Sequence, residues 1–284
     1  MAANSLLAAL GAAAVLAWPS SALAGSSTAQ PKIIGGKTVA HDRLQAVAGV
    51  IRGFGVRTPT CSGVLVGADV VLTASHCLCK AISDVVVFGN KPAVEGSGAL
   101  FYKVIEAANA RNCLEDVNNG LDLGVLRLAA QVKGVAPLQI APDELVGRAT
   151  SFRIAGYGAT DPKSTVYDYL LREAQIGVIS PSCWATPPDR KLSEQYWCRP
   201  GEEIVVGQAN PPGACGGDSG GPLLVSAEGN ATPQPDQAFL LAGVDSRGRA
   251  DRSVCGAGNV YEGIRGRGRE WLRKRLLETR WGKS

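Results

Sequence analysis

Two segments carry side chains suited to proton transfer. The sequence has two histidines, His41 and His76, and His76 stands in the segment TASHC (73–77) directly after an apolar run. An imidazole is a natural general base near neutral pH because its unperturbed pKa is about 6.5. Asp122 stands inside an apolar run, where a carboxylate is costly to bury without a partner such as an imidazole N–H. Each residue alone also fits a structural role, as a hydrogen-bonded histidine or a turn aspartate.

A third segment surrounds one serine with glycines. Ser219 lies in GACGGDSGGPL (213–223). Glycine permits positive φ and close approach of the backbone, so such a loop can direct two N–H groups at one point. That arrangement is what an oxyanion hole requires. A plain tight turn would explain a bare Gly-x-Ser-x-Gly, but the longer run is far more specific.

The elements that must position these segments are short strands. Gly, Pro, Asn or Asp bound most of the apolar, β-branched runs, which are 64–73, 84–88, 121–128, 152–155, 175–179, 222–225 and 239–244. Such a pattern predicts a β-sandwich or β-barrels. Residues 270–278 differ, because their apolar positions form one helical stripe with basic residues between. They predict a short terminal helix whose basic face is solvated or contacts an acidic surface.

Composition limits the class of protein. The chain has 284 residues, of which 45% are hydrophobic and 19% charged, enough for a real core in one large or two modest domains. The formal net charge of +4 is too small to indicate a nucleic-acid binder. The eight cysteines suit four disulfides in an oxidising compartment or metal sites in a reducing one.

The amino terminus favours the oxidising compartment. Residues 6–18 are apolar but too short for a membrane span, and Ala22-Leu23-Ala24 fits a cleavage site, so we expect a signal peptide over 1–24. The stretch lacks a preceding Lys or Arg, and a retained anchor is the alternative. Export predicts a soluble mature protein, secreted, extracellular or periplasmic, with four disulfides. The cysteine spacing also lacks the paired layout of a structural zinc site.

The ordered His, Asp and Ser segments resemble those of the trypsin/chymotrypsin family of serine proteases. Residues 32–36 (KIIGG) resemble a zymogen activation site, and 154–158 (IAGYG) resemble the start of the second barrel. The resemblance implies an all-β fold of two antiparallel six-stranded β-barrels with a C-terminal helix. It divides the chain into a propeptide (25–32), an N-terminal barrel (33–140) and a C-terminal barrel with the helix (141–284).

The same resemblance implies roles for the segments. Ser219 would attack the scissile carbonyl, His76 would accept and return its proton, and Asp122 would orient the imidazole. The N–H groups of Gly217 and Ser219 would form the oxyanion hole. The implied activity is that of a secreted serine endopeptidase; the alternative is a catalytically silent binding protein on the same fold.

Two further implications concern activation and disulfides. Cleavage after Lys32 would free the ammonium group of Ile33 to pair with Asp218 and order the oxyanion loop, so the precursor would be nearly inactive. The family pattern assigns three cysteine pairs and leaves a fourth by elimination; the four are Cys61–Cys77, Cys183–Cys198, Cys215–Cys255 and Cys79–Cys113.

The substrate pocket departs from its relatives. Gly213 and Ala214 would form an uncharged floor, which favours a small, apolar or uncharged P1 side chain. Ser246 and Gly248 match the segment that pairs with substrate backbone, and Asn259 would stand at the pocket wall.

One acid leaves the P1 preference open. Asp245 replaces the usual aliphatic residue, and Arg247 replaces the usual Trp. Asp245 would either receive a Lys or Arg P1 side chain or pair with Arg247, Arg249 or Arg252; the second interpretation is favoured.

The expected partners are protein or peptide substrates and protein protease inhibitors. We expect a monomer with no nucleic-acid partner, no membrane contact in the mature form and no cofactor. Asn90 and Glu95 lie in a loop where some members hold calcium, but two oxygens are too few to predict a metal site.

Overall fold

The computed structural model describes residues 33–40, 43–53, 56–79, 83–184, 191–207, 212–229, 238–249 and 255–279. The predicted signal peptide and propeptide, Lys32, His41 and Arg252 lie outside these ranges. Within them, none of the helices is long and apolar enough to cross a membrane.

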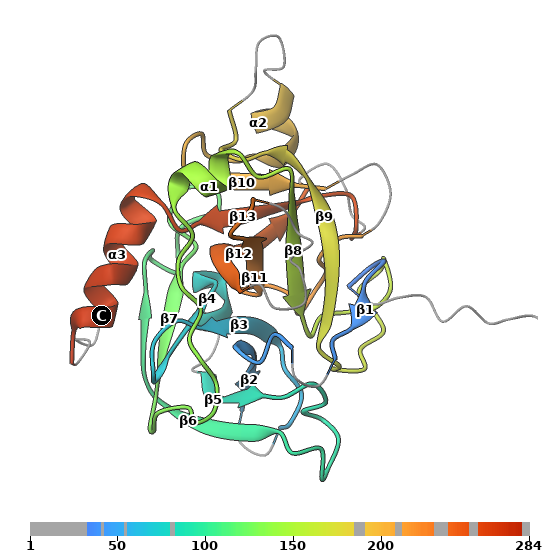
Figure 1. Cartoon of the computed structure of the whole chain (residues 1–284), viewed down its shortest axis with the longest axis vertical. Coiled ribbons are helices and arrows are strands. Elements are labelled where there is room, and N and C mark those ends of the chain that lie inside the picture. Colours follow the sequence, from blue (N-terminus) through green and yellow to red (C-terminus); the bar gives the residue numbers. More distant parts are fainter. Residues whose placement is uncertain are drawn as a thin grey trace, which may run out of the picture.

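Six strands close the first barrel, in the lower half of Figure 1. They are β2 (Val47–Arg52), β3 (Cys61–Leu65), β4 (Val70–Thr73), β5 (Ser83–Phe88), β6 (Leu100–Asn109) and β7 (Gly124–Leu128). All neighbouring pairs are antiparallel, in the spatial order β2-β3-β4-β7-β6-β5.

Six more strands form the second barrel above it (Figure 1). They are β8 (Ser151–Gly156), β9 (Arg172–Ser180), β10 (Glu203–Val206), β11 (Pro222–Ser226), β12 (Phe239–Gly248) and β13 (Asn259–Gly263). The pairing of β8 with β9 closes this sheet. The predicted fold of two six-stranded antiparallel barrels is therefore confirmed.

Shorter elements join or cover the barrels. Strand β1 (Lys37–Thr38) adds to the outside of β9, so the first described segment pairs with the second barrel. The helices α1 (Asp143–Gly147) and α2 (Lys191–Tyr196) flank that barrel. Helix α3 (Gly266–Leu277) instead runs down beside the first barrel (Figure 1).

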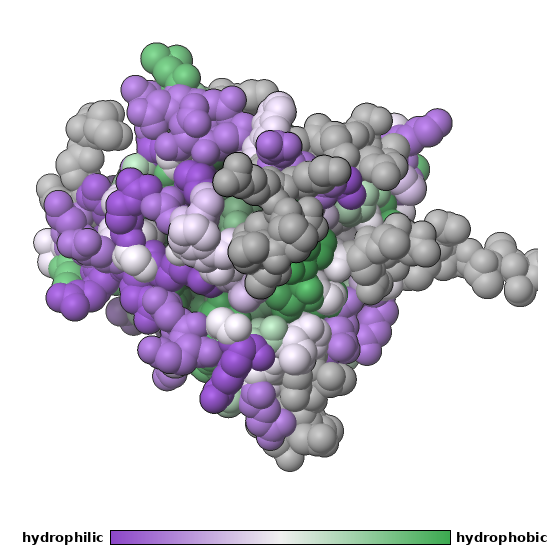
Figure 2. Space-filling model, turned by 90° about the horizontal axis from the view of Figure 1, so that it is seen from above, coloured by the Kyte–Doolittle hydropathy of each residue, from purple (hydrophilic) through white to green (hydrophobic). Residues whose placement is uncertain are grey.

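Apolar side chains fill both barrels. Val64, Leu72 and Leu126 belong to the first core, and Phe152 and Ile176 belong to the second. Burial of apolar area is the main favourable contribution to folding. The face seen in Figure 2 is mostly hydrophilic where residues are described, as expected when apolar side chains are inside.

Two local expectations need correction. The run 121–128 is a strand only from Gly124, so Asp122 lies just before β7 rather than inside it. The terminal helix begins at Gly266, four residues before the stripe at 270–278. A Cβ on Gly268 would meet Leu123 Cδ1 at 3.1 Å, so a residue with poor helix propensity is present because the helix packs closely there.

The four predicted disulfides are present. The structure joins Cys61 to Cys77, Cys79 to Cys113, Cys183 to Cys198 and Cys215 to Cys255. These are the pairs that the family resemblance and elimination imply. The first two lie in the first barrel and the other two in the second.

Candidate active site

His76 and Asp122 meet at the edge of the first barrel. His76 lies in the 3₁₀ turn η1 (Ser75–Leu78), which follows β4 directly. Its Nδ1 is 2.8 Å from Asp122 Oδ2, and its backbone N–H donates to Asp122 Oδ1 at 2.9 Å. The carboxylate therefore holds both the ring and the backbone of the histidine. This fixes Nδ1 as the protonated ring nitrogen and leaves Nε2 to accept a proton.

The second barrel completes the surroundings of Asp122. Ser246 Oγ donates to Asp122 Oδ2 at 2.7 Å, and Asp122 has 0% exposure. Burial alone raises the pKa of Asp122, but hydrogen bonds and charge from His76 and the Ser246 hydroxyl outweigh it and lower that pKa. Asp122 is thus an anion at neutral pH, suited to stabilise an imidazolium.

Ser219 stands on a tight loop just before β11. Gly217 adopts φ +92°, and a Cβ there would meet Gly158 Cα at 2.9 Å. Gly220 adopts φ +79°, and a Cβ there would meet Ser62 O at 2.5 Å. Both positions require glycine, for conformation and for space. The sequence pattern around Ser219 therefore has a steric cause.

Ser62 of the first barrel fastens this loop. Its N–H donates to Ser219 O at 2.8 Å, and its Oγ donates to Gly217 O at 3.0 Å. Cys77 Sγ lies 3.6 Å from the same Ser219 carbonyl oxygen. The Ser219 loop of the second barrel is thereby held against the His76 turn of the first.

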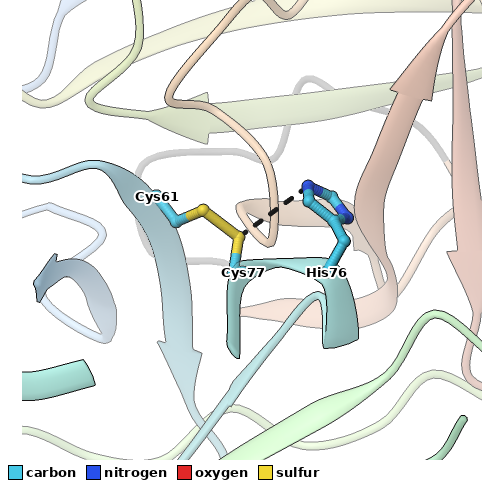
Figure 3. Close-up of side chains that lie close together, drawn as sticks. All are labelled: Cys61, His76 and Cys77. Carbon is cyan, nitrogen blue, oxygen red and sulfur yellow. Dashed lines mark hydrogen bonds between the residues drawn. A yellow bond between two sulfur atoms is a disulfide. The ribbon is translucent and has the colours of Figure 1, made fainter. Parts of the chain in front are cut away.

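The loop that carries Ser219 contacts the turn that carries His76, but the two candidate catalytic side chains are not hydrogen-bonded to each other. Among the described residues, Ser219 Oγ makes no hydrogen bond to His76; the Nε2 atom instead lies 3.9 Å from Cys77 Sγ (Figure 3). In enzymes without bound substrate, catalytic hydrogen bonds are often long and tighten only when substrate binds. His76 keeps a side chain 30% exposed, so its ring is accessible.

The cluster of Cys61, His76 and Cys77 has the residue types of a metal site but not the chemistry. The two sulfurs are bonded to each other, as Figure 3 shows, and a metal requires thiolates. These three residues are therefore explained by the disulfide that supports the His76 turn.

A pocket of about 250 Å³ opens beside Ser219. Four predicted substrate residues line it together with Ser219, and they are Ala214, Asp245, Gly248 and Asn259. Two others lie outside the lining among the described residues. Gly213 packs behind it, where a Cβ would meet Gly256 Cα at 2.7 Å, and Ser246 points to Asp122.

Asp245 is a buried acid in this pocket. It is 3% exposed, and Asn259 Nδ2 donates to its Oδ1 at 3.4 Å. Burial is the largest cause that raises the pKa of Asp245 well above its ordinary value, and the charges of Asp218 and Asp122 add to it. Arg247, the predicted partner, instead binds Glu203 at 2.7 and 2.8 Å. The favoured interpretation, in which Asp245 pairs with a nearby arginine, is therefore not met by Arg247.

Asp218 is buried, and within the part of the chain that the structure describes its hydrogen-bond donors are backbone N–H groups rather than a cation. Its Oδ1 accepts from Gly158 N–H and its Oδ2 from Cys215 N–H, each at 2.9 Å. Burial raises the pKa of Asp218 to about 7, although these two hydrogen bonds oppose the rise. Ile33 is 1% exposed and packs in the second core with Phe152.

Three charged residues near Asp122 were not predicted from the sequence. Glu262 Oε2 accepts the Asp122 N–H at 2.8 Å, Arg199 binds Glu262, and Arg111 Nε lies 3.5 Å from Asp122 Oδ1. Glu262 interrupts the apolar run of β13, which is a signal for a buried acid that needs a partner. Arg111 and Arg199 lie in loops and give no such signal.

Comparison with known proteins gives a consistent result. The family profile described as Trypsin matches residues 33–265. Granzyme A of Bos taurus is 29% identical over 210 residues, which cover 68% of this chain and 73% of that protein. A trypsin-like protease of Streptomyces glaucescens is 28% identical over 222 residues, covering 76% of this chain and 75% of that one.

A solved structure supports the fold independently. The structure titled "Structure of GrC" superposes with a TM-score of 0.66 at 22% identity, covering 86% of this chain and 99% of that chain. At that identity the likeness concerns the fold alone.

Proposed function

The chain belongs to the trypsin family, and from this premise we propose that it is a secreted serine endopeptidase acting through Ser219, His76 and Asp122. The observation that carries the proposal is the His76 Nδ1–Asp122 Oδ2 contact of 2.8 Å beside the Ser219 loop. Trypsin-like proteases act on protein substrates and are often inhibited by proteins, and we extend both properties to this chain as a monomer.

The proposed reaction follows the general serine protease scheme. Ser219 Oγ attacks the scissile carbonyl carbon while His76 Nε2 takes the hydroxyl proton. The tetrahedral oxyanion accepts hydrogen bonds from the N–H groups of Gly217 and Ser219. His76 then gives its proton to the departing amine, leaving an acyl-enzyme. Water, deprotonated by His76, hydrolyses the ester and restores Ser219.

We also propose activation by cleavage after Lys32. Hydrolysis of that bond leaves the α-ammonium of Ile33, which would pair with the Asp218 carboxylate. The burial of Asp218 and of the Ile33 side chain supports this step. An unpaired buried carboxylate is unfavourable, so the new cation would stabilise the loop that carries Ser219.

For the P1 residue, the uncharged floor favours a small, apolar or uncharged side chain. A basic P1 side chain is the second candidate, and one observation favours it. Asp245 is buried in the lining of the pocket, and Arg247 is engaged by Glu203. A Lys or Arg side chain at P1 would supply the positively charged partner that Asp245 does not receive from Arg247.

A peptide-library cleavage profile tests the proposal. The chain is cut behind Lys32, incubated with the library and treated in parallel with a serine-directed fluorophosphonate, and Ser219→Ala serves as the blank. We expect cleavage and labelling that both require Ser219. Absence of both from the cut protein would favour the alternative of a silent binding protein. The residue at P1 decides between the two specificities.

A further inference from the structure

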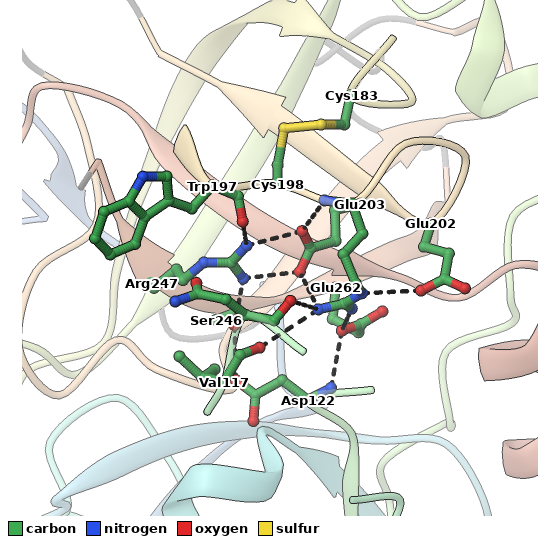
Figure 4. A network of polar contacts seen from close by, with 12 residues as sticks. Val117, Asp122, Cys183, Trp197, Cys198, Glu202, Glu203, Ser246, Arg247 and Glu262 are labelled. Carbon is green, nitrogen blue, oxygen red and sulfur yellow. Dashed lines mark hydrogen bonds and ion pairs between the residues drawn. A yellow bond between two sulfur atoms is a disulfide. The ribbon is translucent and has the colours of Figure 1, made fainter. Parts of the chain in front are cut away.

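Four charged residues lie behind Asp122 and form what we term the Arg–Glu network, namely Arg199, Glu203, Arg247 and Glu262. The two glutamates are buried, whereas the side chains of Arg199 and Arg247 are 16% and 13% exposed; Figure 4 labels Glu203, Arg247 and Glu262. Glu203 on β10 and Glu262 on β13 are register partners, and both are 0% exposed. Like charges directly opposite on neighbouring strands repel. The two arginines compensate this repulsion where the strands pair.

The arginines balance the two acids. Arg199 Nη1 is 3.0 Å from Glu203 Oε1, and its Nη2 is 2.5 Å from Glu262 Oε2. Arg247 adds a bidentate contact to the Glu203 carboxylate, with hydrogen bonds of 2.7 and 2.8 Å. A buried charge is tolerated when it is paired and hydrogen-bonded in this way.

The Arg–Glu network reaches Asp122 from two sides. Glu262 Oε2 accepts the Asp122 backbone N–H at 2.8 Å. On the other side, Arg247 Nη1 donates to Ser246 Oγ at 3.2 Å, and that hydroxyl donates to Asp122 Oδ2 at 2.7 Å. The network thus contacts the backbone of Asp122 directly and its carboxylate through the Ser246 hydroxyl.

Arg199 also contacts the loop that leads to Asp122. Its Nη1 lies 3.4 Å from Val117 O and 3.3 Å from Asn118 O, and both acceptors belong to the first barrel. One guanidinium therefore bridges the second barrel to the segment just before Asp122. Figure 4 shows Val117, Glu203 and Glu262, which all accept hydrogen bonds or ion pairs from Arg199, gathered in one region beside Asp122.

We propose that Arg199 and Glu262 are positioning residues, which hold the Asp122 loop from the second barrel so that the carboxylate meets His76. The inference rests on the proposed function, because it gives Asp122 its role in the triad. It also differs from a role in stability alone, since a purely structural network would not alter the His76–Asp122 hydrogen bond.

The first test measures that hydrogen bond without requiring activity. In a Ser219→Ala background with His41→Asn, the only imidazole is His76, and its Nδ1 proton is observed by low-field proton NMR. We expect Glu262→Leu to shift or broaden this resonance, because the backbone N–H of Asp122 loses its hydrogen-bond acceptor on Glu262. An unchanged resonance in the folded variant would overturn the proposal, whether or not the protein is a protease.

The second test separates positioning from stability in the cut enzyme. At pH 8.5, Glu262→Leu should lower kcat about 10- to 100-fold with little change in KM, because small misplacements of catalytic groups have such effects. Glu173→Gln is the matched control. Glu173 is a buried acid of the same barrel, and its Oε2 lies 2.8 Å from Arg153 Nη1 rather than in contact with the triad. The Glu173→Gln variant should lower the melting temperature but keep kcat.

A conservative variant covers the case in which Glu262→Leu does not fold. Glu262→Gln keeps an acceptor for the Asp122 N–H and removes the charge, so it should lose less kcat than the leucine variant. The charged groups that act on this side chain are Arg199, Glu203 and Asp122, whose N–H it accepts. Arg247 binds Glu203, and Arg111 lies 3.5 Å from Asp122 Oδ1. Because burial raises the pKa of Glu262 to about 7, the kcat ratio of wild type to Glu262→Gln should fall toward one below pH 7.

The outcomes distinguish the two proposals. A wild-type enzyme that neither hydrolyses peptides nor labels at Ser219 refutes the proposed function, and the NMR test still decides the positioning role. An active wild type whose Glu262→Gln and Glu173→Gln variants have equal kcat across the pH range overturns the positioning role alone.

Discussion

Asp218 is the residue whose ionisation should report on chain cleavage. Burial raises its pKa to about 7 from an ordinary value of 3.8. The folded, uncut chain therefore holds this proton more tightly than the unfolded chain, and the contribution to stability is present below about pH 4 and lost as the pH rises through about 7. The loss is at most about 4 kcal/mol.

Urea unfolding of the uncut Ser219→Ala chain between pH 4 and 8 measures this effect. The pH-dependent part is the difference between that protein and its Asp218→Asn derivative, because Asp245 and Glu262 also titrate abnormally. Cleavage after Lys32 should abolish or reverse the difference, since the Ile33 ammonium then favours the carboxylate. A difference that is independent of pH would contradict the raised pKa.

Asp245 gives a prediction about specificity. If a basic P1 side chain binds there, Asp245→Asn should reduce hydrolysis of a Lys anilide about 30-fold or more, because one partner of a buried charge pair is removed. Hydrolysis of an Ala anilide, which does not use the acid, is the internal control. A Lys preference that survives the substitution would eliminate Asp245 as the cation receptor and leave the uncharged P1 interpretation.

The residues of the candidate triad could be predicted because each stands in a local motif. Ser219 needs nearby glycines for its loop, and His76 follows a strand directly, so the sequence shows both. The partners of Arg247 could not be predicted. Its pairing with Glu203 depends on how β10 and β12 are placed in space, which no local pattern records.

At the scale of elements, helix α3 stabilises the barrel that carries His76. Leu272 is 1% exposed and packs in the first core with Leu123. Leu272→Ala should reduce the free energy of unfolding by about 2–5 kcal/mol, through lost burial and a cavity. Leu277→Ala on the same helix is the control, since Leu277 is 74% exposed and should change stability by about 0.5 kcal/mol or less. Equal effects in thermal unfolding would contradict the packing.

Several strands were predictable from short apolar runs bounded by turn residues. The predicted run 222–225 corresponds to β11, whose five residues are all buried. The runs read from the sequence did not include β2, β6, β10 or β13. Glu203 begins β10 and Glu262 interrupts β13, so a charged residue weakens the apolar signal of both strands. The charges of Glu203 and Glu262 are compensated by Arg199 and Arg247, and these tertiary contacts cannot be read from a local sequence pattern. Strand β1 is too short for a periodic signal, and its partner lies in the other barrel.

At the scale of the whole molecule, the two barrels share part of one core. Leu224, Leu241 and Val244 of the second barrel belong to the same buried cluster as Leu126 of the first. Main-chain and side-chain bonds from Ser62 add to this contact. Separate domains often unfold separately, whereas a continuous core couples them.

The shared core predicts one cooperative unfolding transition for both barrels. Leu126→Ala in the first core and Ile176→Ala in the second should each lower the single melting temperature, by about 2–4 °C for each kcal/mol lost. Calorimetry of the Ser219→Ala chain with intact disulfides checks this result, because equal calorimetric and van't Hoff enthalpies define a two-state transition. Two separate transitions, each moved by only one of the substitutions, would show that the barrels are independent. In that case the bonds across the barrel interface, including those of Arg199 to Val117 and Asn118, would contribute to the active site without coupling the folding of its two halves.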